Sequence, residues 1–171
     1  MKIFLLTVIF QVLTFSVILA QTTPQRPDAD RIPDFRSVFD ACGLKFYLPL
    51  LFKEEAIRGK DSCVKRYNSK NTVIMLDVLV YLTPKASRKA EYSDERDFKF
   101  KKIKVNGRKA ELITYYDDEP PKYAESLNFA AVLFVPVISK DGGNLTFWTF
   151  SKTEEDREKA MKIFKSIKFD Y

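Results

Sequence analysis

The chain has 171 residues, of which 29 are basic and 23 acidic, so its formal net charge is +6 at neutral pH, and it has no histidine. The missing histidine excludes Ser-His-Asp and Cys-His nucleophilic sites, histidine acid/base pairs and histidine-ligated zinc. The sequence also has no P-loop, dinucleotide-binding fingerprint or EF-hand loop. We therefore expect no enzyme activity, no cofactor and no metal site.

The start of the chain has the layout of a secretory signal peptide. One positive charge at Lys2 precedes an apolar run from Ile3 to Ala20, and the polar segment QTTPQ follows. That order predicts cleavage after Ala20 and a secreted or periplasmic protein. The run has nearly the length that spans a bilayer, so an uncleaved anchor is the alternative. Residues 21–33, with three prolines and no apolar periodicity, predict a flexible spacer before a single domain over residues 34–171.

Two cysteines occur in the chain, Cys42 and Cys63. An exported chain meets an oxidising compartment, so an even pair predicts a disulfide bond. The spacing is not Cys-x-x-Cys, and this favours a structural bridge over a redox-active one.

The first part of the domain is expected to pass from a helix to strands. Residues 34–43 place apolar side chains at i, i+3, i+4 and i+7, which predicts a short helix that begins at Asp34 and ends at Gly43. The period then changes to two. Strands are predicted over residues 44–49, 62–68 and 72–83, and the last of these is apolar at nearly every position except Asp77. Residues 84–97 are charged and predict an exposed loop.

A hairpin is predicted over residues 98–116. Asn106-Gly107 lies between two strand-like runs, and both central positions of a type I′ turn need a positive φ. A two-residue loop places Val105 opposite Arg108 and Lys102 opposite Glu111, the latter an opposite-charge pair. The apolar positions near the turn and those farther out lie on different faces, so we predict a bulge near Lys101-Lys102.

The remaining elements complete an α+β architecture. Strands are predicted over residues 127–138 and 145–151, followed by a helix capped by Thr153 and a short final strand. The core stripe of that helix consists of Ala160, Ile163, Phe164 and Ile167. We therefore predict an antiparallel sheet of about six or seven strands with the C-terminal helix packed on one face and the short N-terminal helix nearby.

Four segments carry a resemblance to a known family: GLKFYLP near the start of the domain, DS before the second strand, VNGRKAEL in mid-chain and the ending AMKIFKSIKF. Over residues 43–169 the chain resembles small exported bacterial proteins of unknown function, which are similar in outline to the α/β/α sandwich of the PsbP-like photosystem extrinsic proteins. The resemblance implies that fold. It implies no catalytic or binding residues, and the Cys42 and Cys63 pair is not part of the family pattern.

Positive charge is concentrated on the hairpin and the loop before it. The segment from Lys85 to Lys109 has ten basic and four acidic residues. The candidate anion-binding residues are Lys99, Lys101, Lys102, Lys104, Arg108 and Lys109. Such a patch suits an anionic lipid surface, a polysaccharide or nucleic acid, and export makes nucleic acid the least expected partner. The alternative is that these lysines keep an edge hairpin soluble.

Acidic residues and one glycosylation sequon are the other candidates. The clusters Glu54-Glu55, Asp94-Glu95-Asp97 and Asp117-Asp118-Glu119 lie in connections, where solvated charge is the usual reading. Asp77 stands alone in an apolar strand, where a buried acid needs a partner. Asn144 begins a sequon that matters only in a eukaryote, and the turn before it is expected to expose it.

The sequence thus predicts an exported, non-enzymatic binding or interaction module without naming its ligand. One alternative is a lipocalin-like β-barrel that carries an apolar small molecule, although Trp148 is far from the position of that family's Gly-x-Trp signature. The other is a carboxylate-based hydrolase that would use Asp117 or Asp118.

Overall fold

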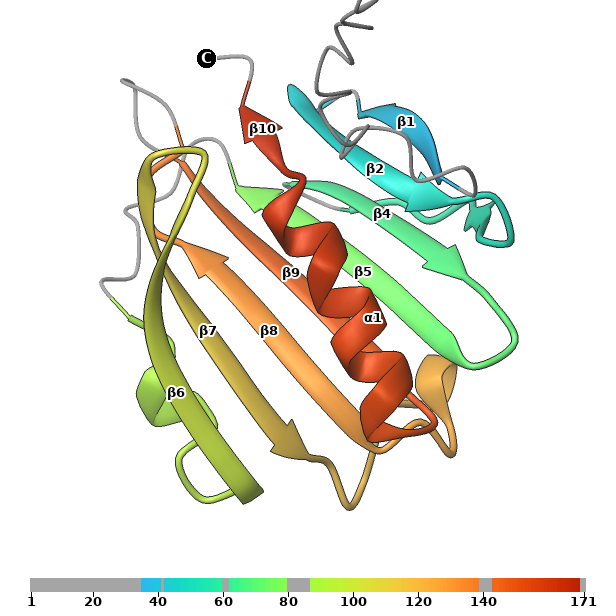
Figure 1. Cartoon of the computed structure of the whole chain (residues 1–171), viewed down its shortest axis with the longest axis vertical. Helices are drawn as coiled ribbons and strands as arrows, with labels where there is room; N and C mark the ends of the chain where they lie inside the picture. Colours follow the sequence, from blue (N-terminus) through green and yellow to red (C-terminus); the bar gives the residue numbers. More distant parts are fainter. Residues whose placement is uncertain (1–34, 41, 60–61, 80–86, 139–142, 170–171) are drawn as a thin grey trace, which may run out of the picture. The chain divides into compact units, whose positions relative to one another are not determined.

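A computed structural model describes residues 35–40, 42–59, 62–79, 87–138 and 143–169 (Figure 1). The expected signal peptide over residues 1–20 and the spacer over residues 21–33 lie outside the described residues, so both stay predictions. None of the helices that the described residues form has the length and apolar content needed to cross a membrane.

Within the described residues, seven antiparallel strands form a large sheet in the order β3-β4-β5-β9-β8-β7-β6 (Figure 1). Their bounds are β3 Lys53–Glu55, β4 Cys63–Asn68, β5 Thr72–Leu79, β6 Arg96–Val105, β7 Arg108–Tyr116, β8 Phe129–Val135 and β9 Asn144–Ser151. The predicted antiparallel sheet is confirmed, although the short β3 was not predicted. This sheet is open, because β3 and β6 at its ends each pair with one neighbour in the described part of the chain. The lipocalin-like barrel is therefore wrong.

A small sheet has the order β1-β2-β10, with bounds β1 Phe35–Asp40, β2 Leu44–Pro49 and β10 Lys168–Phe169. The helix predicted over residues 34–43 is wrong, since β1 pairs with β2 along its whole length. Phenylalanine and valine favour strands, and pairing with β2 overrides a helical spacing only two turns long. Gly43, with a φ of 74°, lies in the turn that joins the two strands and does not end a helix.

The C-terminal helix is confirmed as α1, Glu154–Lys165. Thr153 is its N-cap, and its Oγ1 accepts a hydrogen bond from the Asp156 backbone N–H at 3.2 Å. Three acids in the first turn and two lysines in the last complement the helix dipole. The predicted core stripe is buried at all four of its positions: Ala160, Ile163, Phe164 and Ile167.

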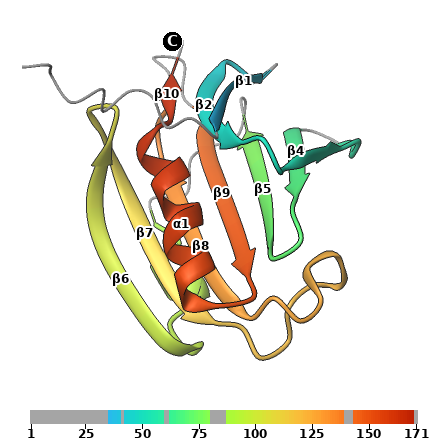
Figure 2. The ribbon, with the colours of Figure 1, turned by 45° about the vertical axis from the view of Figure 1, so that its right-hand side comes forward.

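The main core lies between the large sheet and a layer made of α1 and β2 (Figure 2). Phe147 on β9 is fully buried at its centre. Its ring lies edge-on to Phe46 of β2 at 5.5 Å and to Phe164 of α1 at 5.1 Å between centroids. This one side chain therefore joins the large sheet, the small sheet and the helix.

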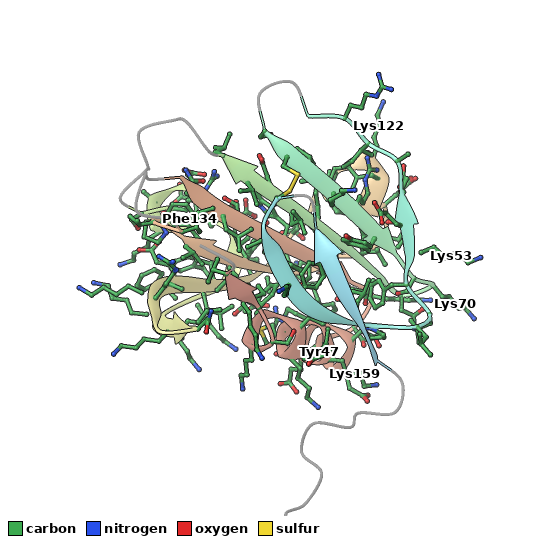
Figure 3. The ribbon with its side chains drawn as sticks, turned by 90° about the horizontal axis from the view of Figure 1, so that it is seen from above. Tyr47, Lys53, Lys70, Lys122, Phe134 and Lys159 are labelled. Atoms are coloured by element: carbon green, nitrogen blue, oxygen red, sulfur yellow. A yellow bond between two sulfur atoms is a disulfide. The ribbon has the colours of Figure 1, made fainter. Side chains whose placement is uncertain are left out.

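The predicted disulfide between Cys42 and Cys63 is present (Figure 3), and the Cα atoms of the two residues lie 5.8 Å apart. Cys42 lies between β1 and β2, and Cys63 is the first residue of β4. The bond therefore ties the small sheet to the large one.

The other face of the large sheet, which we call the opposite face, carries a second apolar cluster. Two short 3-10 turns, η1 Lys89–Glu91 and η2 Lys122–Ala124, belong to the segments that pack there. Residues 84–97 were expected to form an exposed loop, but Tyr92 of this segment packs against the second cluster. The sheet is therefore apolar on both faces.

This second cluster explains why the bulge prediction is wrong. The register of β6 against β7 is regular from Lys99 to the turn, and it shifts between Arg96 and Lys99 instead of at Lys101-Lys102. Asp97, at the shift, has a φ of 57°, which is typical of a bulged residue. The strand does not need to change face, because alternate residues of β6 pack into two different clusters.

Candidate binding site on the basic hairpin

The six predicted cations lie together on the β6–β7 hairpin, which forms one end of the large sheet. Its turn is confirmed, since Asn106 and Gly107 have φ values of 46° and 79°. The predicted register is also confirmed, with Val105 opposite Arg108. Arg108 is half-buried under contact with the Phe169 ring, and the other cations are exposed: Lys99, Lys101, Lys102, Lys104 and Lys109.

The hairpin cations are divided between the two faces of the sheet. Ile103 on β6 belongs to the α1 side, and Phe100 belongs to the cluster of the opposite face. Because side chains alternate along a strand, Lys99, Lys101 and Arg108 lie on the α1 face. By the same alternation Lys102, Lys104 and Lys109 lie on the opposite face. The sequence located the patch but did not predict this division.

The three cations of the opposite face line part of a hollow of about 580 Å³. Its described lining consists of Lys102, Ile103, Lys104, Lys109, Ala110, Glu111 and Pro136. Lys104 and Lys109 are directly opposite each other in the hairpin. Like charges at such positions repel, so an anion bound between them would relieve a cost that the free protein carries.

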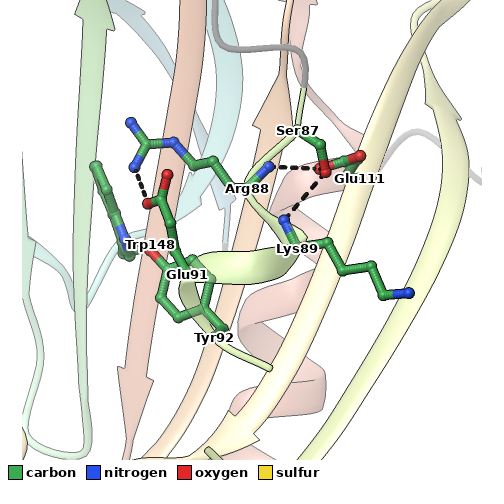
Figure 4. A network of polar contacts seen from close by, with 7 residues as sticks. All are labelled: Ser87, Arg88, Lys89, Glu91, Tyr92, Glu111 and Trp148. Carbon is green, nitrogen blue, oxygen red and sulfur yellow. Dashed lines mark hydrogen bonds and ion pairs between the residues drawn. The ribbon is translucent and has the colours of Figure 1, made fainter. Parts of the chain in front are cut away.

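Glu111 is the only acidic residue in the described lining of this hollow. Lys102 is its cross-strand neighbour, as predicted, but the two make no ion pair among the described residues. Instead the Glu111 Oε2 accepts hydrogen bonds from the Ser87 hydroxyl and the Arg88 backbone N–H, both at 3.0 Å (Figure 4). Glu111 is 8% exposed, so its carboxylate serves these hydrogen bonds within the protein.

No exposed lysine of the hairpin has an ion pair with any residue that the structure describes. Some cations outside the hairpin are paired: Lys65 contacts Glu54 at 2.7 Å and Arg157 contacts Glu154 at 2.8 Å. Five exposed lysines without an ion pair to a described residue are therefore concentrated on this one hairpin.

The segment from Ser87 to Tyr92, which Glu111 binds at its start, is also held by the side chain of Arg88 (Figure 4). The Arg88 guanidinium lies over the rings of Phe134 and Trp148 at 5.3 and 5.7 Å, and it pairs with Glu91 at 2.9 Å. The Trp148 indole N–H donates to the Tyr92 hydroxyl at 3.1 Å. Burial raises the pKa of Tyr92, so it stays a neutral phenol. These contacts fix the segment beside the hollow.

From the sequence, Glu111 was expected only to face Lys102, and Arg88 was counted only as one of the basic residues of its segment. Glu111 reads as one charge among many in the hairpin, and its partners come from a segment more than twenty positions away. The available signal was Glu111 itself, an acid at a position that alternation places on the same face as Ile113.

Replacing Glu111 by Ala should lower the free energy of unfolding by about 1–3 kcal/mol, because the Ser87 hydroxyl and the Arg88 backbone N–H, both in part-buried hydrogen bonds, lose their charged acceptor. Glu111→Gln keeps an acceptor oxygen and should cost less than half as much. Urea unfolding of the two variants measures the difference. Equal losses for both variants would show that the hydrogen bonds to Ser87 and Arg88 are not what the carboxylate contributes.

Several residues of the predicted acidic clusters make contacts at the protein surface. Glu54 and Glu55 pair with Lys65 and Arg66 across β3 and β4. The Asp117 Oδ1 accepts the Glu119 backbone N–H at 3.0 Å. No group of three or more His, Cys, Asp or Glu side chains among the described residues has the geometry of a metal site.

Asp117 nevertheless has a perturbed acid-base equilibrium. Partial burial raises its pKa, and the neighbouring charges of Asp118 and Glu119 add to the effect. The pKa of Glu95 is raised by desolvation and by the charges of Asp117, Asp118 and Asp94. The acids at this end of the hairpin therefore repel one another at neutral pH.

This repulsion gives a pH-dependent prediction. A carboxyl whose folded-state pKa is raised stabilises the fold below its unfolded pKa, and the contribution is lost as the pH rises through the folded pKa. Asp117→Asn cannot ionise but keeps the oxygen that accepts from Glu119. The variant should be more stable than the parent at about pH 7, and the advantage should vanish near pH 3. Urea unfolding at both pH values measures it, and an advantage that persists in acid would contradict the assignment.

Two further residues that the sequence singled out as candidate functional residues, Asp77 and Asn144, lie in β5 and β9. Asp77 is half-buried opposite Thr146, and its Oδ1 has no hydrogen-bond partner among the residues that the structure describes. Asn144, at the start of β9, is only 3% exposed. The prediction that the turn exposes Asn144 is therefore wrong. Attachment of a glycan at Asn144 would have to precede folding.

A second exposed feature lies far from the hairpin. Leu50 and Leu51, between β2 and β3, are 63% and 66% exposed. Leu51 borders a smaller hollow of about 450 Å³ together with Lys53 and Lys70. The sequence did not single out this apolar tip, and it is the main rival to the hairpin as a contact surface.

Comparisons with known proteins add little to this description. No protein-family model and no curated protein sequence matches the chain. Among solved structures, the chain is similar to the crystal structure of the Saccharomyces cerevisiae Ran-binding protein Mog1p, with 11% sequence identity and a TM-score of 0.47. The match covers 80% of this chain and 95% of that one. A likeness this distant carries no argument about function.

Proposed function

We propose that the chain is an exported, non-enzymatic binding domain that captures an anionic partner on the β6–β7 hairpin. The observation that carries the proposal is the set of five exposed lysines without an ion pair to any described residue, two of them directly opposite each other beside a hollow. An anionic polysaccharide or lipid surface would compensate these charges. The predicted signal peptide and the Cys42 to Cys63 disulfide support export.

We also propose that the chain is related to the PsbP-like proteins that its sequence resembles. It is supported by the α+β architecture, in which a C-terminal helix packs on one face of an antiparallel sheet. The kinship adds no ligand and no site residue to the proposal.

The test compares two variants with the same net charge. The hairpin variant replaces four lysines on β6 by Gln: Lys99, Lys101, Lys102 and Lys104. The control variant replaces four exposed lysines outside the hairpin: Lys53, Lys70, Lys122 and Lys152. Figure 3 shows Lys53, Lys70 and Lys122 on the side of the molecule away from the hairpin. Binding of both variants to dextran sulfate is then measured over a range of salt concentrations.

The hairpin variant should bind about tenfold more weakly or worse, because each exposed ion pair contributes roughly 0.2–1 kcal/mol. The control variant should bind like the parent, and parent binding should weaken steeply with salt. Equal losses in the two variants would show that only net charge matters. The lysines would then serve to keep the edge strand from aggregating.

A further inference from the structure

The hairpin presents an unpaired strand edge as well as positive charge. β6 has ten residues and lies at the end of the large sheet (Figures 1 and 2). Among the described residues it pairs only with β7. An exposed edge of this length is a template for adding another strand, because half of its backbone N–H and C=O groups point away from the sheet.

The turn determines which backbone groups point outward. A type I′ turn closes with a hydrogen bond between Val105 and Arg108, so the backbone groups of Val105 face β7. In an antiparallel pair this orientation alternates from residue to residue. The N–H and C=O groups of Phe100, Lys102 and Lys104 therefore point away from β7.

The division of the lysines between the two faces favours a partner at this edge. A flat surface or a chain lying across one face reaches only the lysines on that face. A strand added beside β6 has side chains on both faces, so it meets Lys99 and Lys101 on one and Lys102 and Lys104 on the other.

We propose that the β6 edge binds an acidic, extended peptide segment by strand addition. This inference rests on the proposed function and names the class of partner. A second copy of the chain does not fit the edge, because two β6 strands side by side would bring their lysines together. A polysaccharide could neutralise the charge but offers no peptide groups to continue the ladder.

The charge pattern of residues 99–104 specifies a probe. The order Lys-Phe-Lys-Lys-Ile-Lys has the same charge pattern in both directions, so one complementary peptide fits parallel or antiparallel. The probe is Thr-Glu-Val-Glu-Glu-Val-Glu-Thr with blocked ends. Its control replaces both valines by proline, which keeps four glutamates but removes two backbone donors and disfavours a strand.

Two measurements with the whole protein test the inference. The first is the affinity of each peptide by fluorescence anisotropy, with the valine probe expected to bind at least about tenfold more tightly than the proline control. The second is amide hydrogen exchange, in which the N–H groups of Phe100, Lys102 and Lys104 should become protected when the valine probe binds.

A matched pair of variants separates charge from backbone pairing. Lys102→Gln and Lys102→Pro lose the same charge, but only the proline variant loses the outward N–H, and it leaves the ladder with β7 intact. The proline variant should bind the valine probe several-fold more weakly than the glutamine variant. If Lys102→Pro does not fold, the exchange measurement on the unaltered protein decides.

The outcomes distinguish the two proposals. Equal affinities for the two peptides, with no new amide protection, would overturn strand addition. If the four-lysine hairpin variant then still loses dextran sulfate binding, the proposed function stands without it. If neither the peptides nor dextran sulfate responds to that variant, the proposed function fails as well.

Discussion

Replacing Phe147 by Ala should lower the free energy of unfolding by about 3–5 kcal/mol, more than any other single change considered for this chain. Phe147 is fully buried on β9, and its ring contacts Phe46 of the small sheet and Phe164 of α1. Removing the ring leaves a cavity where three elements meet. None of the three can close it alone, because each is also held by its own neighbours.

Urea unfolding followed by circular dichroism measures this loss. The control is Tyr47→Ala, which removes an aromatic ring that is 45% exposed on β2, and it should cost under about 1 kcal/mol. If Phe147→Ala costs no more than Tyr47→Ala, the core is not organised around β9, and the packing of α1 and β2 on the large sheet would be contradicted.

Removing the disulfide is the second large effect. The Cys42→Ala, Cys63→Ala double variant should lose about 3 kcal/mol, because the bond closes a loop with a sequence separation of 21 in the unfolded chain. For a chain of this size the melting temperature should fall by roughly 6–12 °C. The loss should be concentrated in the small sheet, which the bond ties to β4.

Thermal melts with and without reductant measure this effect. Reductant should lower the melting temperature of the parent towards that of the double variant and leave the double variant unchanged. A parent protein whose melting temperature does not respond to complete reduction, with both thiols then accessible to alkylation, would show that the bridge contributes nothing to stability.

The parts of the fold that the sequence predicted depend on local chemistry. Asn106-Gly107 specifies the hairpin and its register, because few other residues tolerate the backbone of a type I′ turn. Thr153 and the spacing after it specify α1, because a helix end is capped by residues a few positions away. Such signals are complete within a window of a few residues.

The errors arise where contacts between separate elements decide the structure. Residues 35–40 have helical spacing, but they form β1 because β2 is there to pair with them. A bulge at Lys101-Lys102 presupposes one buried face, whereas the segments before β6 and after β7 cover the other face. No local pattern indicates which faces of a sheet other parts of the chain will cover.

The candidate site was predicted in part. The six cations could be listed from the sequence, because a known register places them on one hairpin. Their division between two faces depends on the second apolar cluster, and the lack of a Lys102–Glu111 ion pair depends on the segment at Ser87 and Arg88. These contacts are long-range, and they determine how much of the charge remains for a partner.

Anion binding by the hairpin can be tested by mapping where an anion binds on the unaltered protein. Amide resonances of isotope-labelled protein are followed during titration with dextran sulfate at low salt. If the hairpin lysines bind the anion, the largest shifts fall on residues 99–109 and disappear when salt is added. Shifts concentrated at Leu50 to Lys53 and Lys70, or spread evenly over the lysines of the chain, would contradict it.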